Sequence, residues 1–261
     1  MKSQSYPSAQ TDGQWEHIKD RFPVHQGRGR PRELELRWVV NAILYVAMTG
    51  CQWRYLPKEY PAWQSVYSYF RKWQKDGTWL QIHERLRAQV RQKAGRHKHP
   101  TGGCLDSQSV KTTAVPGERD YDSAKKVVGR KRHVLVDTLG LLLCVVVTAA
   151  CVSQSAGARL VLRRMPGGCK KLRKVWVDGG YFGTVLEWAL LKLRLMLEVV
   201  KRPPEQKGFS VLPRRWVVER TFAWLSYHRR LSKEYERFPK TSETFIYIAM
   251  TRIILRRLHP N

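Results

Sequence analysis

Acidic residues are scarce in this chain of 261 residues, which has 21 Asp and Glu against 48 Lys and Arg. A formal net charge of +27 destabilises a compact protein by self-repulsion, so the composition indicates a polyanionic partner. Nucleic acid fits this requirement best, and an anionic membrane surface or a ribosomal setting is the alternative. A hydrophobic content of 43% excludes a fully disordered chain.

Long hydrophobic runs are also missing. The longest uncharged apolar stretch, residues 139–152, is 14 residues long and rich in Val. A membrane-spanning helix needs about 20 apolar residues, so this stretch is typical of a core strand and no membrane is expected as partner. The five cysteines include no CxxC pair, which argues against a disulfide framework or a zinc site. Without a signal-peptide pattern at the start, we expect a cytoplasmic protein.

The first third of the chain is predicted to form a set of short helices. Apolar residues recur at helical spacing over residues 11–22, 31–49, 62–77 and 78–93. Six of the ten Trp residues lie before residue 80. A basic, glycine-containing stretch follows, so residues 1–95 are predicted to form a small all-α domain of the helix-turn-helix kind that binds DNA.

Two parts of this domain are candidates for DNA contact. Arg28 and Arg30 lie in an Arg-Gly-Arg-Pro segment, a type that inserts into a narrow minor groove. The same segment is also explained as a linker whose proline begins the next helix. Arg71 and Lys72 lie on the polar face of the helix predicted over 62–76. That face is either a recognition surface or simply solvated.

From residue 96 the pattern changes to strands and helices, which predicts an α/β domain over 96–261. Along the chain the predicted elements follow the order β-β-β-α-β-α-β-α, with one more helix at the end. This order indicates a mixed sheet covered by helices. Strands are predicted over 105–112, 127–137, 141–150, 174–177 and 196–200, and helices over 156–165, 183–193, 214–231 and 242–258.

Three carboxylates lie in unusually apolar settings. Asp106 is in a buried strand, Asp178 ends another strand before two glycines, and Glu219 is in the middle of an apolar helix. A buried Asp is rare unless it is paired or binds a metal. Oxygen ligands suit Mg²⁺ or Mn²⁺, and two such ions about 3.5–4 Å apart can promote phosphodiester displacement. Any one of the three is also explained as a polar residue near a turn. Rival trios can be drawn from Asp120, Asp122, Asp137, Glu187 and Glu198.

A basic cluster lies beside the hairpin expected near residue 138. Its members are Lys125, Lys126, Arg130, Lys131, Arg132 and His133. With the net charge of the chain, the cluster favours contacts to DNA phosphates. A solvated strand edge is the other interpretation.

Longer motifs carry more specific information. They include Thr49-Gly50-Cys51-Gln52-Trp53-Arg54, Trp63-Gln64-Ser65-Val66-Tyr67, Asp106-Ser107-Gln108-Ser109-Val110-Lys111-Thr112, Gly129-Arg130-Lys131-Arg132-His133, Asp178-Gly179-Gly180-Tyr181 and Arg215-Trp216-Val217-Val218-Glu219-Arg220-Thr221. In these the chain resembles bacterial insertion-sequence transposases of the DDE class, in the IS-five-like branch of the IS-four group. The resemblance covers nearly the whole chain.

The resemblance implies an RNase H-like catalytic domain in which Asp106, Asp178 and Glu219 form the triad that holds two Mg²⁺ or Mn²⁺ ions. It further implies a homo-oligomer in the bacterial nucleoid that binds double-stranded DNA at the element's inverted repeats. Water would cleave these ends, and the freed 3′ ends would join target DNA.

The wider group has a Tyr, Arg, Glu, Lys signature around the glutamate. Arg215 matches its Arg, whereas Leu212 and Ser226 stand where Tyr and Lys are expected. Arg230 is expected to share the helix face of Glu219, so Arg215 and Arg230 join the candidate DNA contacts. A junction-resolving nuclease with the same fold and a non-catalytic DNA-binding repressor from a decayed copy are the alternatives.

Overall fold

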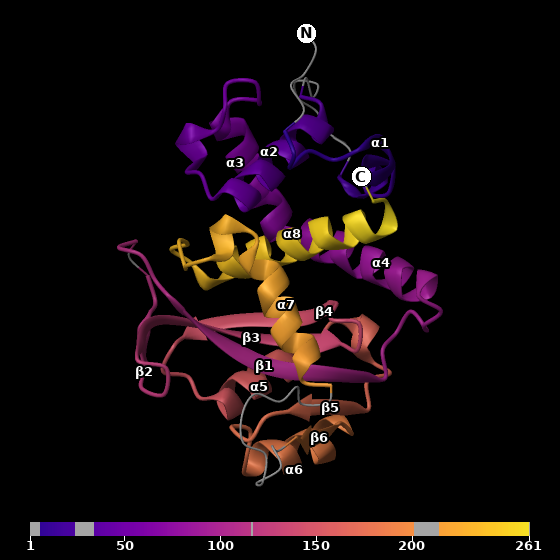
Figure 1. Cartoon of the computed structure of the whole chain (residues 1–261), viewed down its shortest axis with the longest axis vertical. Coiled ribbons are helices and arrows are strands. Elements are labelled where there is room, and N and C mark those ends of the chain that lie inside the picture. The colour runs from indigo at the N-terminus through magenta and orange to yellow at the C-terminus, as the bar shows by residue number, and fades with distance from the viewer. Residues whose placement is uncertain (1–5, 24–33, 116, 201–213, 261) are drawn as a thin grey trace.

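The computed structural model describes residues 6–23, 34–115, 117–200 and 214–260. Figure 1 shows a group of helices at one end, a twisted sheet below it and further helices on both faces of the sheet. The predicted contacts Arg28 and Arg30 lie outside the described residues. The N-terminal helices are α1 (Asp12–Glu16), η1 (Lys19–Arg21), α2 (Leu36–Thr49), η2 (Trp53–Tyr55), α3 (Trp63–Lys75) and α4 (Thr78–Lys93).

The sheet is mixed, as predicted. Its strands are β1 (Gly102–Lys111), β2 (Asp120–Asp122), β3 (Val127–Asp137), β4 (Leu142–Ala149), β5 (Lys174–Val177) and β6 (Met196–Val199). β1 is central: it pairs antiparallel with β3 on one side and parallel with β5 on the other. β4 and β2 extend the β3 side, and β6 extends the β5 side. The short β2 lies in a stretch that the sequence pattern had indicated as a charged loop.

Further helices follow strand β4 in the chain. They are α5 (Gln154–Arg163), η3 (Gly167–Cys169), α6 (Thr184–Leu193), α7 (Trp216–Ser226), η4 (Arg229–Leu231) and α8 (Pro239–Leu258). Helix α7 is shorter than the predicted range 214–231. Helix α8 begins three residues earlier than predicted, because Pro239 occupies its first turn, where proline's fixed φ is favourable.

The hairpin between β3 and β4 is confirmed. Asp137 ends β3, and its Oδ1 accepts hydrogen bonds from the backbone N–H of Leu139 and of Leu141 at 2.9 Å each. Gly140 takes φ +78°, a conformation that glycine adopts without a side-chain penalty. Asp137 is fully buried and paired with Arg91, so this rival carboxylate has a structural role.

Strand alternation divides the core between the two faces of the sheet. On β1, Cys104 faces the cluster that contains α7 and α8, whereas Leu105 faces the cluster under α5 and α6. On β3, Val134 and Leu135 divide in the same way. Because side chains alternate along a strand, Asp106 lies on the same face as Cys104, toward α7.

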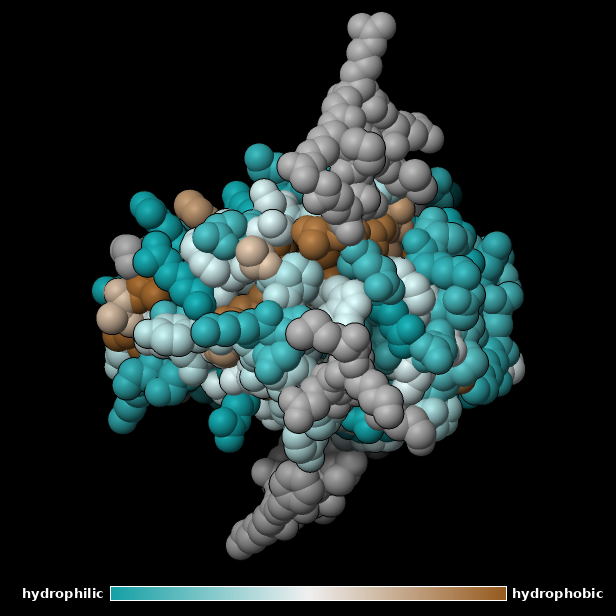
Figure 2. Space-filling model, turned by 90° about the horizontal axis from the view of Figure 1, so that it is seen from above, coloured by the Kyte–Doolittle hydropathy of each residue, from teal (hydrophilic) through white to brown (hydrophobic). Residues whose placement is uncertain are grey.

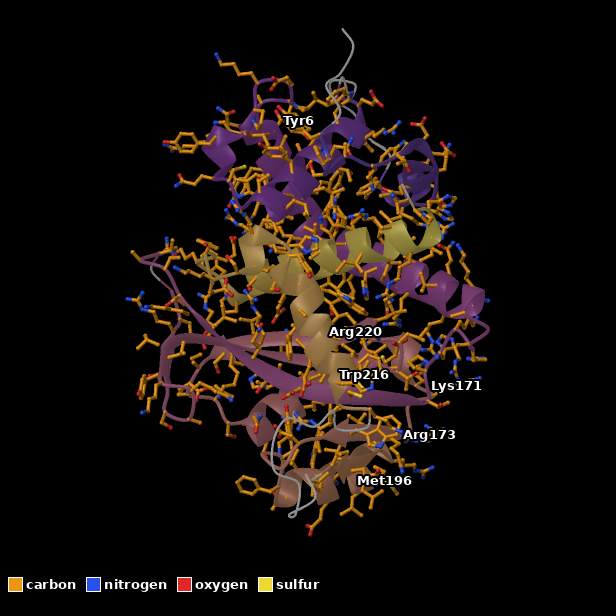
Figure 3. All side chains as sticks on the ribbon, in the orientation of Figure 1. Tyr6, Lys171, Arg173, Met196, Trp216 and Arg220 are labelled. Atoms are coloured by element: carbon orange, nitrogen blue, oxygen red, sulfur yellow. The ribbon has the colours of Figure 1, made fainter. Side chains whose placement is uncertain are left out.

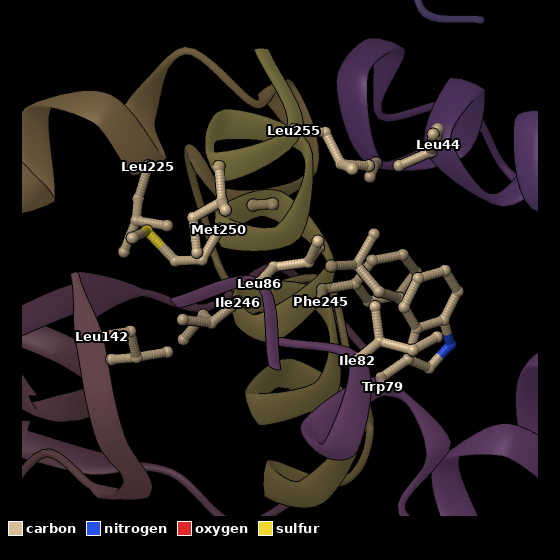
Figure 4. Packing of buried hydrophobic residues seen from close by; sticks show 14 of the residues in the cluster. Leu44, Trp79, Ile82, Leu86, Leu142, Leu225, Phe245, Ile246, Met250 and Leu255 are labelled. Atoms are coloured by element: carbon tan, nitrogen blue, oxygen red, sulfur yellow. The ribbon is translucent and has the colours of Figure 1, made fainter. Parts of the chain in front are cut away.

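The N-terminal helices share their core with the C-terminal helix. Figure 4 shows Leu44 of α2, Ile82 and Leu86 of α4, and Phe245 and Met250 of α8 in one continuous cluster. The predicted boundary near residue 95 therefore separates two sequence regions that are packed together. Seen from the helical end, the described surface is mainly hydrophilic, with small hydrophobic patches (Figure 2). No helix in the described ranges is long and apolar enough to cross a membrane.

Candidate active site

The parallel pairing of β1 and β5 brings two of the predicted carboxylates side by side. Cys104 is in register with Trp176. Two residues further along each strand direction lie Asp106 and Asp178, which therefore project from the same face of the sheet. This adjacency follows from strand register and could not be read from the separation of 72 positions in the sequence.

Asp106 is held in a buried, oriented position. Its Oδ1 accepts a hydrogen bond from the backbone N–H of Ser107 at 2.7 Å, and the residue is 8% exposed. Burial raises the pKa of Asp106 to about 6; the Ser107 N–H and Arg215 oppose this rise, and nearby Asp178 adds to it. At neutral pH the carboxylate is therefore mainly ionised, with Oδ2 directed at a cation.

Asp178 follows β5 in a tight turn. The backbone N–H of Gly180 donates to its Oδ1 at 2.9 Å, and the side-chain amide of Gln154 approaches its Oδ2 at 3.4 Å. A Cβ at position 180 would lie 1.6 Å from Oε1 of Gln154, so any side chain there would displace that amide. Gly180 therefore allows a close approach of α5 to the site.

Helix α7 crosses this face of the sheet and brings the third carboxylate. Val217 and Val218 are buried against the sheet, and the Sγ of Cys104 contacts the carbonyl of Arg214 at 3.1 Å. Arg215 and Glu219 are one helical turn apart. The apolar neighbours of Glu219 in the sequence thus anchor the helix, while the Glu219 side chain remains 57% exposed.

One guanidinium nitrogen joins all three carboxylates. Nη2 of Arg215 lies 3.1 Å from Asp106 Oδ2, 3.6 Å from Asp178 Oδ2 and 4.0 Å from Glu219 Oε1. Each of the three carboxylate oxygens therefore lies within 4.0 Å of this one nitrogen, so the three carboxylates are close neighbours. The structure brings the predicted trio together around a positive charge.

The donor set suits a hard divalent cation, with Arg215 standing where such a cation would bind. All three side chains offer carboxylate oxygens, the ligands that Mg²⁺ and Mn²⁺ prefer. Among the described residues, no group of three or more His, Cys, Asp or Glu is arranged tightly enough to hold a metal ion.

Tyr181 and Gln154 are site residues that the sequence did not predict. Tyr181 is 1% exposed, and its pKa is raised by burial and by the charges of Asp106 and Asp178. Gln154 lies in α5, far from Asp178 in the sequence. The one feature of the sequence that could have indicated Tyr181 is its position directly after Asp178-Gly179-Gly180. Because this segment forms a tight turn, Tyr181 lies close to Asp178.

Most of the predicted basic cluster is buried, which corrects its interpretation as a set of phosphate contacts. Arg130, at 1% exposure, donates to the carbonyls of Glu118, Glu236 and Arg237. Arg132 donates to Leu231, and Lys131 pairs with Asp122 at 3.1 Å. Arg130 and Arg132 each lie 3.6 Å from a carboxylate oxygen of the buried Glu234, so the charges of the cluster are balanced inside the protein. Lys125 and Lys126 are exposed.

Arg230 is also committed inside the protein. It lies in η4, because α7 ends at Ser226, and so it does not share the helix face of Glu219. Its Nε pairs with Oε1 of Glu236 at 2.6 Å, and its Nη1 donates to the carbonyl of Cys51. On α3, Lys72 is exposed, whereas Arg71 is half-buried and hydrogen-bonded to Gln74.

Comparison with known proteins identifies the family. Residues 97–254 match the family described as "Transposase DDE domain", and residues 11–83 match the "Putative transposase of IS4/5 family". The chain belongs to the DDE transposase family. The "Putative transposase for insertion sequence element IS402" of Burkholderia cepacia is 31% identical over 116 residues, 42% of this chain. The chain spans about half the length (54%) of this curated relative.

The predicted triad lies entirely inside the matched transposase domain. The mixed sheet with helices on both faces fits the RNase H-like α/β fold expected of that domain. Membership of this family thus relates the convergence of the three carboxylates to the chemistry that transposases carry out on DNA.

Proposed function

We propose that this chain is a DNA transposase that binds the terminal inverted repeats of its insertion sequence, cleaves them by two-metal phosphodiester hydrolysis and joins the 3′ ends to target DNA. The observation that carries the proposal is the convergence of Asp106, Asp178 and Glu219 around one cationic nitrogen. The match to the DDE domain supports it. A homo-oligomer that pairs two DNA ends in the bacterial nucleoid completes the proposal.

In this proposal Asp106, Asp178 and Glu219 would hold two Mg²⁺ or Mn²⁺ ions. When bound, these ions would activate the attacking water or 3′-hydroxyl and stabilise the leaving oxygen. Asp106 supplies a fixed oxygen because the Ser107 N–H orients its carboxylate. Gln154 and the Gly180 N–H orient Asp178 in the same way. Arg215, once withdrawn from the carboxylates, can neutralise a phosphate beside the scissile bond.

We also propose that α3 reads DNA as the recognition helix of the N-terminal region. Gln64, Ser68 and Lys72 recur every four residues and are all exposed. Residues at this spacing share one helix face, and this face lies away from the core that α3 shares with α8. A helix with a free polar face can enter the major groove.

The test is strand cleavage of DNA that carries the element's ends, with Mg²⁺, by Asp106→Asn, Asp178→Asn and Glu219→Gln. Each variant should lose about a hundredfold or more in cleavage rate, because each removes one charged oxygen ligand. Glu16→Gln is the matched control, since this carboxylate pairs with Lys19 on the surface of the N-terminal helices, outside the matched DDE domain. Full activity in any one triad variant would refute the assignment of that residue.

The same assay separates the alternatives. Cleavage of branched DNA without joining to target DNA would support a junction-resolving nuclease. Binding that is equal in EDTA and Mg²⁺, with no cleavage, would support a repressor.

A further inference from the structure

Four side chains on α7 and α8 form a layered arrangement, here named the Arg–Trp stack: Trp216, Arg220, Trp224 and Arg257. The guanidinium carbon of Arg220 lies 4.4 Å from the ring centre of Trp216 and 4.6 Å from that of Trp224. Arg257, in the last turn of α8, lies 4.3 Å from the Trp224 ring. Aromatic and cationic groups therefore alternate from the start of α7 to the end of α8.

Helical spacing explains the arrangement. Trp216, Arg220 and Trp224 follow one another at intervals of four residues on α7, and such residues are neighbours on one helix face. Figure 3 shows Trp216 and Arg220 one above the other along this helix. Trp216 is 40% exposed, and the other members are half-buried. The stack is thus a surface feature with ordered side chains.

Stacking leaves the edges of the two guanidinium groups as their free hydrogen-bonding sites. The faces of Arg220 are occupied by the indole rings, and its Nη2 donates to the Leu139 carbonyl at 3.2 Å. Its Nε is buried without a hydrogen-bond partner among the described residues, so a phosphate would be contacted by the terminal Nη atoms. Planar N–H edges held in a fixed direction match the geometry of phosphate oxygens.

The positive charge of the stack is not neutralised by carboxylates. In the part of the chain that the structure describes, neither Arg220 nor Arg257 forms an ion pair. Asp137 is the acid whose charge acts on both. That carboxylate is fully buried, paired with Arg91 and bonded to the hairpin N–H groups. The two arginines are therefore available to an external anion.

The stack and the candidate active site share helix α7. Glu219 and Arg220 are consecutive residues of α7, so the helix that supplies the third carboxylate also carries the stack. Beside Trp216 is a cavity of about 370 Å³ lined by Arg96, Arg214 and Trp176, among others. Arg214 lies 4.3 Å from the Trp176 ring centre, which repeats the same pairing at the other side of the cavity.

We propose that the Arg–Trp stack is a track for the backbone phosphates of double-stranded DNA that runs from Trp216, on the helix that supplies Glu219, along α7 to the end of α8. The proposal rests on the proposed function, because DNA is the anion that the site would cleave. The indole rings hold the guanidinium groups in place before binding, so less side-chain entropy is lost when phosphates arrive. Phosphate contacts of this kind position DNA without reading its sequence.

The test measures the affinity of the full-length chain for a 30-base-pair duplex of mixed sequence as a function of salt concentration. Each lost phosphate contact should make the slope of log K against log salt about 0.9 less negative. Arg220→Gln with Arg257→Gln should therefore change the slope by about 2, and at about 0.1 M salt should weaken binding roughly tenfold per contact. Thermal unfolding of each variant shows whether it is folded.

Two further variants make the test specific. Trp224→Leu keeps both charges but removes the ring between them; it should weaken binding severalfold if stacking presents the arginines. Arg159→Gln with Arg163→Gln is the matched control, because these arginines stack on Trp188 at 5.0 and 5.4 Å on the opposite face of the sheet. It should change the slope less than the stack variant.

The outcomes distinguish the two proposals. If the wild-type chain shows no salt-dependent binding to DNA, the proposed function fails. If the wild-type chain binds DNA but the folded stack variants keep the wild-type slope, the track is refuted and the proposed function stands. If stack and control variants reduce the slope equally, general surface charge explains the binding and the track is likewise refuted.

Discussion

The arrangement of the candidate site depends on single charged side chains, and Arg215 shows this most clearly. It gathers three carboxylates that would otherwise repel one another across a few ångströms. Its side chain is 14% exposed and that of Asp106 11%, so the interaction is only weakly screened by solvent. The same position is the one that a divalent cation would take. In the proposed function, Arg215 and the cation would compete for the same oxygens.

Replacing Arg215 by Gln should lower the stability of the protein by on the order of 1–2 kcal/mol in EDTA, because three converging carboxylates lose their common partner. Added Mg²⁺ should then raise the melting temperature of Arg215→Gln more than that of the wild type. The measurement is thermal unfolding of both proteins in EDTA and in Mg²⁺. An equal Mg²⁺ effect in both would contradict the competition.

His133 predicts a pH dependence of stability that is separate from the site. It is fully buried on β3, with Nε2 near Oγ1 of Thr148 and its ring against Gly157 of α5. Burial, and then the charge of Lys131, lowers the pKa of His133 to about 4. The unfolded chain, with an ordinary histidine pKa of about 6.5, binds the proton more strongly. Stability contributed by neutral His133 is present above that pH and is lost as pH falls toward 4.

The loss should reach on the order of 3 kcal/mol for this residue. Denaturant unfolding between pH 7 and pH 4.5 should show a shallower decline for His133→Gln than for the wild type. At pH 8 the histidine is neutral in both the folded and the unfolded state. The difference in unfolding free energy between the two proteins at this pH therefore gives the packing cost of the substitution alone. Parallel declines would show that His133 does not titrate in this window.

At the scale of elements, helix α3 tests whether the N-terminal region reads DNA sequence. Gln64 and Ser68 share an exposed face with Lys72. Changing Gln64 and Ser68 to Ala should reduce the preference for the element's terminal DNA over random DNA by about 1–3 kcal/mol per base contact. Lys72→Gln should weaken binding to both DNAs equally, as expected for a phosphate contact.

Competition binding with the two DNAs measures this preference. Gln81→Ala on α4, which is also exposed, is the control. An unchanged preference after substitution of Gln64 and Ser68 would show that α3 is only a solvated helix.

For the whole molecule, α8 joins the two regions that the sequence separates. Phe245, Ile246 and Met250 pack with residues of α2, α4 and β4 in one cluster. Buried side chains of this size stabilise by about 1.5–3 kcal/mol each, so the N-terminal helices without α8 would lose much of their core. The helices proposed to read DNA and the domain proposed to cleave it thus share one hydrophobic core.

A fragment of residues 1–95 is therefore expected not to unfold cooperatively. Near-ultraviolet circular dichroism during heating would show this, and addition of a peptide covering residues 239–258 should restore a transition. A sharp transition of the fragment alone would show that the region is an independent domain.

The sequence alone determined the family and most of the elements, although it missed β2 and extended α7 too far. The 3.6-residue and two-residue periodicities predicted the helices and the mixed sheet, because amphipathic patterns reflect which side of an element is buried. The three carboxylates stood out because charged residues are costly in apolar surroundings. Their identity as the catalytic triad stays a prediction.

The tertiary structure decided which charges are free. Arg130 and Arg132 look like surface cations in the sequence, but neighbouring carbonyls and Glu234 satisfy them beneath η4. Arg220 and Arg257 are unremarkable in the sequence, yet two helices align them on Trp216 and Trp224. Burial and partnership depend on contacts between distant segments, and no local pattern encodes them. For that reason the sequence indicated that this protein binds a polyanion, and only the fold shows which basic side chains are paired inside the protein and which are exposed.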